Sequence, residues 1–293
     1  MKYMTYGLLV MGLCSGNQLL SSSNVDTTAP SLESKFLSAA IDGKSSVLQE
    51  CISTGVNLDA RAAGSGATAL QLAAFGNHTT CVEILLSASK SNIDDFDSHG
   101  KSAVHVAAFL GHKDVLIQLL EAGAFIDNVN PLTGLTPLHM AVLRTQTTSV
   151  RTLAQCGADI NARTPSNATA LHFAAVGGEK GYRKVEEDLF YENNDSENEK
   201  IAHILLQFGA DSKAQQQSGI TPLDLAEHFN NRLVKKLLTR QCAQCGKSAV
   251  WRICSKCKGK AYCNRDCQSI HWEVHKRECY ESPLLRSGAE ANK

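Results

Sequence analysis

An excess of charge of one sign is the first thing this sequence lacks, because 29 Lys and Arg residues balance 29 Asp and Glu residues. The balance hides an asymmetry. Residues 1–240 carry 19 basic and 24 acidic side chains, whereas residues 241–293 carry 10 and 5. Seven cysteines in that last segment add negative charge when they bind metal as thiolates, so the basic excess gives little support to a nucleic-acid partner.

A long apolar run is also missing near the N-terminus, where the run Gly7–Cys14 is too short to span a bilayer. One Lys precedes this run and small residues follow it, which gives residues 1–31 a weak export-signal pattern. A plain N-terminal extension is the alternative. With 43% hydrophobic and 20% charged residues, the composition excludes a chain that is disordered throughout.

A disulfide framework is the third absence. Seven of the 11 cysteines lie between Cys242 and Cys279, and the other four are scattered. Clustered C-x2-C pairs beside isolated cysteines indicate metal binding in a reducing compartment. We therefore expect a cytoplasmic or nuclear protein, with export left open by the N-terminal pattern.

Internal repeats are what the sequence has in abundance. Five segments of one pattern, such as GKSAVHVAAFLGH and GLTPLHMAVLRTQ, align without gaps, and a degenerate copy precedes them from Ser34. The five begin at Gly66, Gly100, Gly134, Asn167 and Gly219. Over residues 32–240 the chain resembles the ankyrin-repeat family, which has a 33-residue period and a T-P-L-H-x-A signature.

The resemblance implies an all-α fold, a solenoid of about six helix pairs joined by β-hairpin loops. Thr136 and Pro137 suit a helix start, and the paired alanines leave room for close helix packing. Gly111, Asn77 and Asn230 share a position that requires a left-handed backbone. The wide spacing before the last copy predicts an insertion near residues 179–199, in which the segment NNDSENE should form an exposed acidic loop.

Two recurring positions bear on function. His105, His139 and His172 recur in register, and we interpret them as structural residues near the helix start, not metal ligands. In ankyrin stacks the residue after the alanine pair tends to face the concave side. Phe75, Phe109 and Leu143 occupy that position and would form an apolar partner-binding patch. Packing against the preceding hairpin is the alternative.

The C-terminal region has the ligand spacing C-x2-C-x8-C-x2-C-x5-C-x3-C-x7-H-x3-C. Eight thiolate and imidazole ligands suffice for two structural zinc ions, since each such ion takes four. A segment of this size cannot bury enough core to fold alone, so zinc must stabilise it. The eight candidate ligands are Cys242, Cys245, Cys254, Cys257, Cys263, Cys267, His275 and Cys279.

Residues 242–279 resemble the MYND-type zinc finger, including Tyr262, Gln268 and Trp272 around the ligands. That family interleaves its sites. The resemblance therefore implies one zinc on the first, second, fifth and sixth ligands and another on the remaining four, although spacing alone permits a sequential arrangement. It also implies that Gln268 and Trp272 line a groove for a proline-containing peptide. Packing in the small core is the alternative for Trp272. Residues 282–293 should be a disordered tail.

No residues remain for a catalytic domain. Eight ligands for two zinc ions leave no open coordination position, and the segment HWEVH lacks the Glu that directly follows the first His in a metalloprotease helix. We expect a non-enzymatic adaptor that binds protein partners and no small-molecule substrate. The alternatives are a nucleic-acid-associated regulatory protein that uses the basic finger, or a non-catalytic subunit of an enzyme complex.

Overall fold

The repeat region is a stack of helix pairs. A computed structural model describes residues 31–89, 92–177, 195–239, 252–253 and 261–262 of the chain. Within these residues the first helices of the pairs are α2 (Leu32–Asp42), α4 (Ala69–Phe75), α6 (Ala103–Leu110), α8 (Pro137–Leu143), α10 (Ala170–Val176) and α13 (Pro222–His228). The second helices are α3 (Ser45–Ser53), α5 (Thr79–Ala88), α7 (Lys113–Glu121), α9 (Thr147–Gln155), α12 (Asp195–Gln207) and α14 (Arg232–Thr239).

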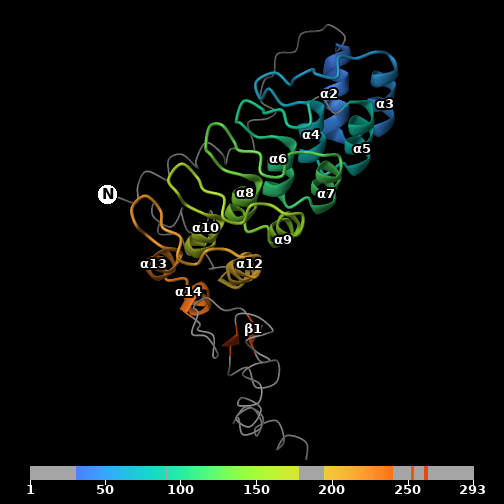
Figure 1. Cartoon of the computed structure of the whole chain (residues 1–293). Coiled ribbons are helices and arrows are strands. Elements are labelled where there is room, and N and C mark those ends of the chain that lie inside the picture. The colour runs from blue at the N-terminus through green and yellow to red at the C-terminus, as the bar shows by residue number, and fades with distance from the viewer. Residues whose placement is uncertain (1–30, 90–91, 178–194, 240–251, 254–260, 263–293) are drawn as a thin grey trace, which may run out of the picture.

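The helices form two rows along the stack. Each first helix packs against its own second helix and against the first helices of the neighbouring pairs, and the second helices also pack against one another. The loops between pairs project from one side of the stack (Figure 1). Hydrogen bonds close these loops as hairpins, for example from Asn130 N–H to Leu135 C=O (2.9 Å) and from Thr164 N–H to Ala168 C=O (2.9 Å). The predicted helical solenoid with hairpin loops is confirmed.

Helix starts follow from the repeat signature. Thr68, Ser102, Thr136, Thr169 and Thr221 cap the first helices, each in a capping box with the side chain three residues later. These boxes satisfy backbone N–H groups that the first turn of a helix leaves unpaired. Because they recur in every complete copy, each first helix begins at the same point of its repeat.

The left-handed position after the first helix is also confirmed. Gly111 has a φ of 83°, Asn77 of 59° and Asn230 of 54°. This turn lets the chain reverse directly into the second helix, and Gly and Asn adopt it with little strain. The alanine pairs of α4, α6 and α10 are buried, so consecutive first helices approach one another closely.

The end of the insertion differs from the sequence expectation. Residues 195–199, expected to lie in an exposed acidic loop, form the first turns of α12. Thr147 Oγ1 donates to a carboxylate oxygen of Glu197 (2.8 Å), and Lys200 Nζ donates to the other (2.6 Å). Asn198 is buried. These contacts and the favourable placement of acidic groups at a helix N-terminus explain the helix. The preceding part of the expected insertion lies outside the described residues.

Two short strands lie in the C-terminal region. Strand β1 (Arg252–Ile253) pairs antiparallel with β2 (Ala261–Tyr262), so that Arg252 is opposite Tyr262. In the sequence each strand ends directly before a predicted zinc ligand, Cys254 or Cys263.

Candidate functional site

The candidate partner-binding residues occupy one repeat position but differ in exposure. Phe75, at the end of α4, is 37% exposed. Phe109, one repeat later in α6, is half-buried at the edge of the core. Since α4 packs directly against α6, these two aromatic residues belong to adjacent repeats of one surface.

Leu143 is the exception, and its assignment to an exposed patch is wrong. Only 1% of this side chain is accessible, and every residue of α8 is buried. The neighbouring helices do not by themselves explain the difference. Helix α8 packs between α6 and α10 and against α9, and α6 packs in the same way between α4 and α8 and against α7. Because it is buried, Leu143 contributes to the core and not to a docking surface.

Phe109 lies between two cations. Lys101 Nζ is 5.2 Å from the ring centroid, and Arg144 Cζ from the next repeat is 4.8 Å from it. Both distances are within the range of a cation–π interaction. The sequence position alone did not indicate this environment, because Lys101 comes from the preceding hairpin and Arg144 from the turn between α8 and α9. The surface at Phe109 thus combines an aromatic ring with positive charge.

The recurring histidines are structural, as predicted. His105 Nδ1 accepts hydrogen bonds from the Ser102 N–H (3.2 Å) and hydroxyl (2.9 Å), and its Nε2 donates to Leu135 C=O in the next hairpin (3.1 Å). His172 repeats the arrangement with Thr169 and Ile220 C=O. The rings of His105 and His172 therefore cap their own helices and hold the following repeat in place. His139 Nδ1 accepts from Thr136 in the same way (N–H 3.3 Å, hydroxyl 2.9 Å), but its buried Nε2 has no hydrogen-bond partner among the described residues.

Burial lowers the pKa of His105, His139 and His172 to about 4. Desolvation disfavours the charged ring, and a protonated Nδ1 would lose its role as an acceptor for the capping residue. In the second repeat Gln71 occupies the same position and donates to Asp95 C=O (2.6 Å) and Lys101 C=O (2.8 Å). A neutral amide therefore performs the same function without a titrating group.

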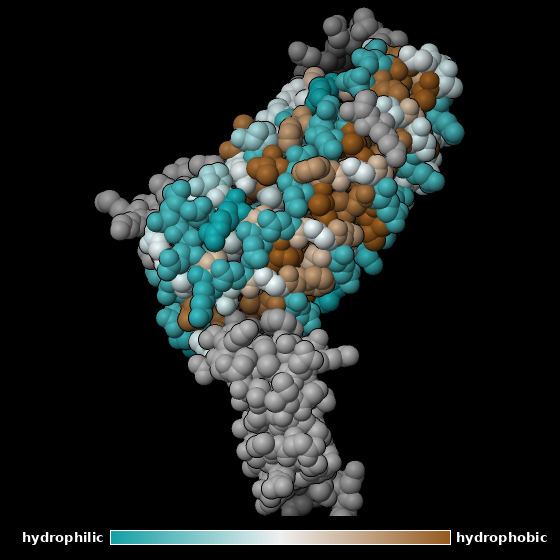
Figure 2. All heavy atoms as spheres, viewed as in Figure 1, coloured by the Kyte–Doolittle hydropathy of each residue, from teal (hydrophilic) through white to brown (hydrophobic). Residues whose placement is uncertain are grey.

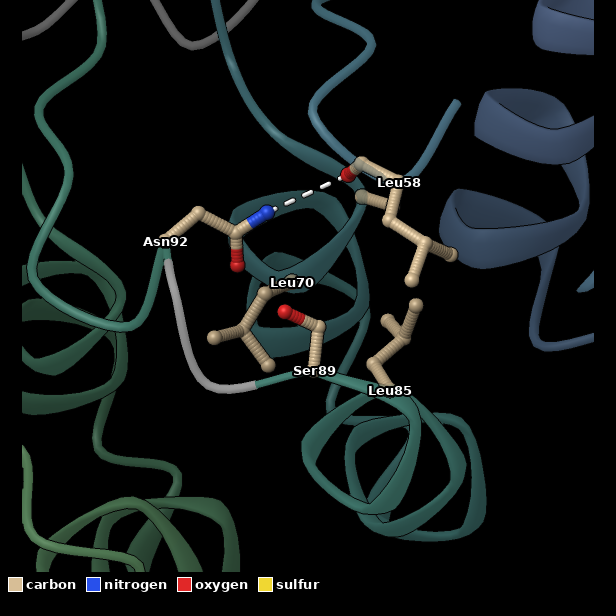
Figure 3. A pocket seen from close by; sticks show the side chains of 6 residues that line it. Leu58, Leu70, Leu85, Ser89 and Asn92 are labelled. Carbon is tan, nitrogen blue, oxygen red and sulfur yellow. Dashed lines mark hydrogen bonds between the residues drawn. The ribbon is translucent and has the colours of Figure 1, made fainter. Parts of the chain in front are cut away.

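A small hollow lies beside α4 and α5, lined by Leu58, Ala69, Leu70, Leu85, Ser89 and Asn92. Asn92 Nδ2 donates to Leu58 C=O (3.1 Å) across its mouth (Figure 3). None of the described residues that line this hollow has a titratable side chain. In the described part of the chain, no cluster of three or more His, Cys, Asp or Glu side chains is arranged to hold a metal ion. None of the described helices has both the length and the apolar character of a bilayer span.

All eight predicted zinc ligands lie outside the described residues, as do Gln268 and Trp272. Their placement remains a prediction from sequence.

The sequence reasoning missed one group of exposed apolar side chains. Phe125, Val129 and Leu132 lie on the hairpin between α7 and α8 and are more than half exposed. Figure 2 shows apolar residues exposed at several places along the stack, bordered by hydrophilic ones. A comparison of the hairpins in repeat register could have revealed Phe125 and Val129, because the other hairpins carry mostly polar residues at these two positions.

Comparison with known proteins identifies both parts of the chain. Residues 36–130 match a model of ankyrin repeats in three copies, residues 133–165 match a single ankyrin repeat, and residues 242–279 match the MYND finger. The chain is also similar to a crystal structure of an ankyrin repeat domain from Acinetobacter baumannii, with 26% identity and a TM-score of 0.57. That match covers 69% of this chain and 94% of the other.

Two relatives are similar over shorter stretches. The B-cell lymphoma 3 protein homolog of Mus musculus is 35% identical over 116 residues, which are 39% of this chain and 26% of that protein. The nuclear factor NF-kappa-B p105 subunit of Gallus gallus is 33% identical over 164 residues, which are 54% of this chain and 14% of that protein. The chain thus covers about a quarter or less of each relative.

Proposed function

This chain carries ankyrin repeats followed by a MYND zinc finger, and from that premise we propose that it is a non-catalytic adaptor. Both modules are of kinds that serve protein interaction, and the finger implies zinc binding. In the proposal the repeat stack binds one protein through the surface at Phe75 and Phe109, while the finger binds a proline-containing segment of another. The observation that carries it is the exposed aromatic side chain of Phe75 on the helix next to that of the cation-flanked Phe109.

The repeat surface suits a protein partner for two reasons. An aromatic side chain left partly exposed on an ordered helix end offers apolar area at little entropic cost, and such residues dominate interface energies. The cations of Lys101 and Arg144 lie within 5.2 Å and 4.8 Å of the Phe109 ring. They add charge that selects among partners.

For the finger, we propose two structural zinc ions held by the eight ligands named above, in the interleaved arrangement of the family. Thiolate and imidazole ligands in this number close both coordination shells, so the metal stabilises the module and performs no chemistry. Gln268 and Trp272 would contact the proline-containing peptide. The entropic cost of binding an extended proline segment is small, because such a segment has little conformational entropy to lose.

The test uses proximity labelling with the full chain in three forms: the natural sequence, Phe75→Ser with Phe109→Ser, and Trp272→Ala. We expect the double variant to lose one set of labelled proteins and Trp272→Ala to lose a different set enriched in proline-containing segments. Each labelled protein that is lost is then purified and titrated against the same variants, with an expected loss of at least about tenfold in affinity.

Two controls make the result interpretable. The melting temperature of the repeats shows whether the double variant still folds, and the zinc content shows whether Trp272→Ala still has an intact finger. If both variants are folded and lose the same proteins, or lose none, the two-surface adaptor is contradicted.

A further inference from the structure

The hairpin between α7 and α8 exposes an unusual amount of apolar surface. We define the apolar hairpin as Ala124–Leu135. Its Phe125, Val129 and Leu132 are 65%, 53% and 63% exposed. In the described part of the chain these are the three most exposed large hydrophobic side chains. Exposed apolar side chains scattered singly need no explanation, but three on one hairpin indicate an interaction surface.

The other hairpins carry mostly polar residues at the same repeat positions. Counted from the glycine or equivalent residue that ends the second helix, the position of Phe125 holds Asn57, Asn92, Asp159 and Asp211 elsewhere in the stack. The position of Val129 holds Arg61, Phe96, Arg163 and Gln215. Of these, Phe96 is half-buried beside the His105 ring, with 6.3 Å between ring centroids. The repeat fold therefore does not require apolar side chains at these places, and a role in folding does not explain them.

Two turns order the backbone that carries the three side chains. The first turn is closed by a hydrogen bond from Asn128 N–H to Phe125 C=O (3.3 Å). The second is built on Asn130, whose buried side-chain oxygen accepts from the N–H groups of Leu132 (2.9 Å) and Thr133 (3.0 Å). Asn130 Nδ2 also donates to His99 C=O in the preceding hairpin (3.0 Å). An ordered scaffold of this kind reduces the entropic cost of binding.

The apolar hairpin itself carries one charged side chain, that of Asp127, and further carboxylates border it. An Asp94 carboxylate oxygen accepts from Phe125 N–H (2.9 Å), and both Asp127 carboxylate oxygens accept from Asp159 N–H (3.1 Å each). These contacts place carboxylates at the base of the hairpin and in the next repeat. Between Gly123 and Leu135 the sequence contains no Lys or Arg. The described cations of the two adjacent hairpins are engaged elsewhere: Lys101 Nζ lies over the Phe109 ring, and Arg163 donates to Asn167 C=O (3.4 Å) and Gln215 C=O (3.1 Å). A partner that covers the apolar side chains would therefore meet the carboxylates of Asp94 and Asp127.

From this geometry we propose that the apolar hairpin docks a basic amphipathic segment of a partner protein. Apolar side chains of the segment cover Phe125, Val129 and Leu132, and its Lys or Arg side chains meet Asp94, Asp127 and Asp159. Complementary charge at the rim selects the partner and speeds its association, while the buried apolar contacts supply the affinity. This surface is separate from the one at Phe75 and Phe109, so either proposal can fail alone.

The experiment selects a random peptide display library on the full chain and tests the enriched peptides on the triple variant Phe125→Ser, Val129→Ser and Leu132→Ser. The probes are the enriched peptides themselves, titrated by fluorescence anisotropy. We expect a class of peptides that combines apolar residues with Lys or Arg and loses at least about tenfold in affinity on the triple variant. Because all three side chains are more than half exposed, the melting temperature should stay within a few degrees of that of the natural chain.

A second variant tests the charge without disturbing the fold. Asp94→Asn with Asp127→Asn keeps the hydrogen-bond acceptors, since Asn161 has this role in the following repeat and its Oδ1 accepts from Asp211 N–H (2.8 Å). We expect about a threefold to tenfold weaker affinity for the basic peptides and a shallower dependence on salt concentration. Phe208→Ser is the matched surface control, because this side chain is 39% exposed and belongs to neither proposed surface, and it should leave these affinities unchanged.

Three results would overturn the proposal. One is that no enriched peptide depends on the three apolar side chains. Another is that the dependent peptides are acidic or uncharged. The third is that the natural chain self-associates and the triple variant is monomeric, which would make a second copy of the chain the occupant.

Discussion

The repeat stack and the finger achieve stability in different ways. In the stack, buried apolar helices pack against neighbours on both sides, and capping side chains such as His105 extend into the next repeat. The finger spans residues 242–279 and has too few residues for such a core, so its stability must come from metal binding. The difference teaches that one chain can present two binding modules whose stabilities respond to different conditions.

Zinc removal should have the largest effect on stability, and it should destabilise the finger without destabilising the repeat stack. Structural zinc contributes on the order of 10–16 kcal/mol in finger peptides, so chelation or Cys242→Ser should unfold the finger. The melting transition of the repeats, followed by far-ultraviolet circular dichroism, should be unchanged. Cys156→Ser is the matched control, because Cys156 is an exposed free cysteine of the stack. Unfolding of the repeats on chelation would show that the stability of the stack also depends on zinc, which contradicts the contrast between the two modules.

Truncation of a core residue should have the converse effect. Leu143→Ala removes a fully buried side chain from α8 and should cost about 2–5 kcal/mol of stack stability. Denaturant titration measures the loss, and zinc content measured on the same sample should not change. A cost below about 1 kcal/mol would show that Leu143 is not held in the core as described.

Acid should weaken the stack through its histidines. The folded-state pKa values of His105, His139 and His172 are about 4, below the value of about 6.5 expected in the unfolded chain. The unfolded chain therefore binds more protons, and stability is fully present above about pH 6.5 and is lost as the pH falls towards 4. Each histidine should contribute on the order of 2 kcal/mol to this loss.

Substitution by Gln provides the control for this pH effect. Gln71 already occupies the same position and forms the same kind of cap and inter-repeat bonds. The triple variant His105→Gln, His139→Gln and His172→Gln should therefore fold and show a flatter melting temperature between pH 7 and pH 4.5. An unchanged pH profile would assign the acid sensitivity to other groups.

The smallest effect on stability should come from Phe75→Ser. The side chain is 37% exposed at the end of α4, so the change should cost no more than about 1 kcal/mol. Thermal melting measures that cost, and partner affinity should fall even though the fold persists. A loss of several kcal/mol would instead assign Phe75 to the core, as found for Leu143.

Local features of the stack were predictable from sequence. The capping residues, the left-handed turn at Gly111 and the capping role of His105 all follow from the chemistry of one repeat, and the structure confirms them. These features depend on residues three or four positions apart. A repeated pattern therefore determines them without reference to the rest of the chain.

Features that depend on neighbouring repeats were not predictable in this way. Phe75, Phe109 and Leu143 share a repeat position, yet Leu143 is buried and Phe75 is 37% exposed, although α4 and α8 are flanked by neighbouring helices in the same way. The early turns of α12 depend in part on the Thr147 contact with Glu197, which lies 50 residues away in sequence. Exposure and long-range contacts are properties of the assembled stack, so the periodic pattern did not reveal them.

The most direct test of the adaptor proposal is X-ray absorption spectroscopy of the zinc-loaded full chain, combined with its metal content. We expect two zinc ions per chain, an inner sphere made of sulfur and imidazole nitrogen, and no oxygen ligand. An ion with a bound water or other exchangeable oxygen would contradict the proposal, because an open coordination position is what catalytic zinc requires.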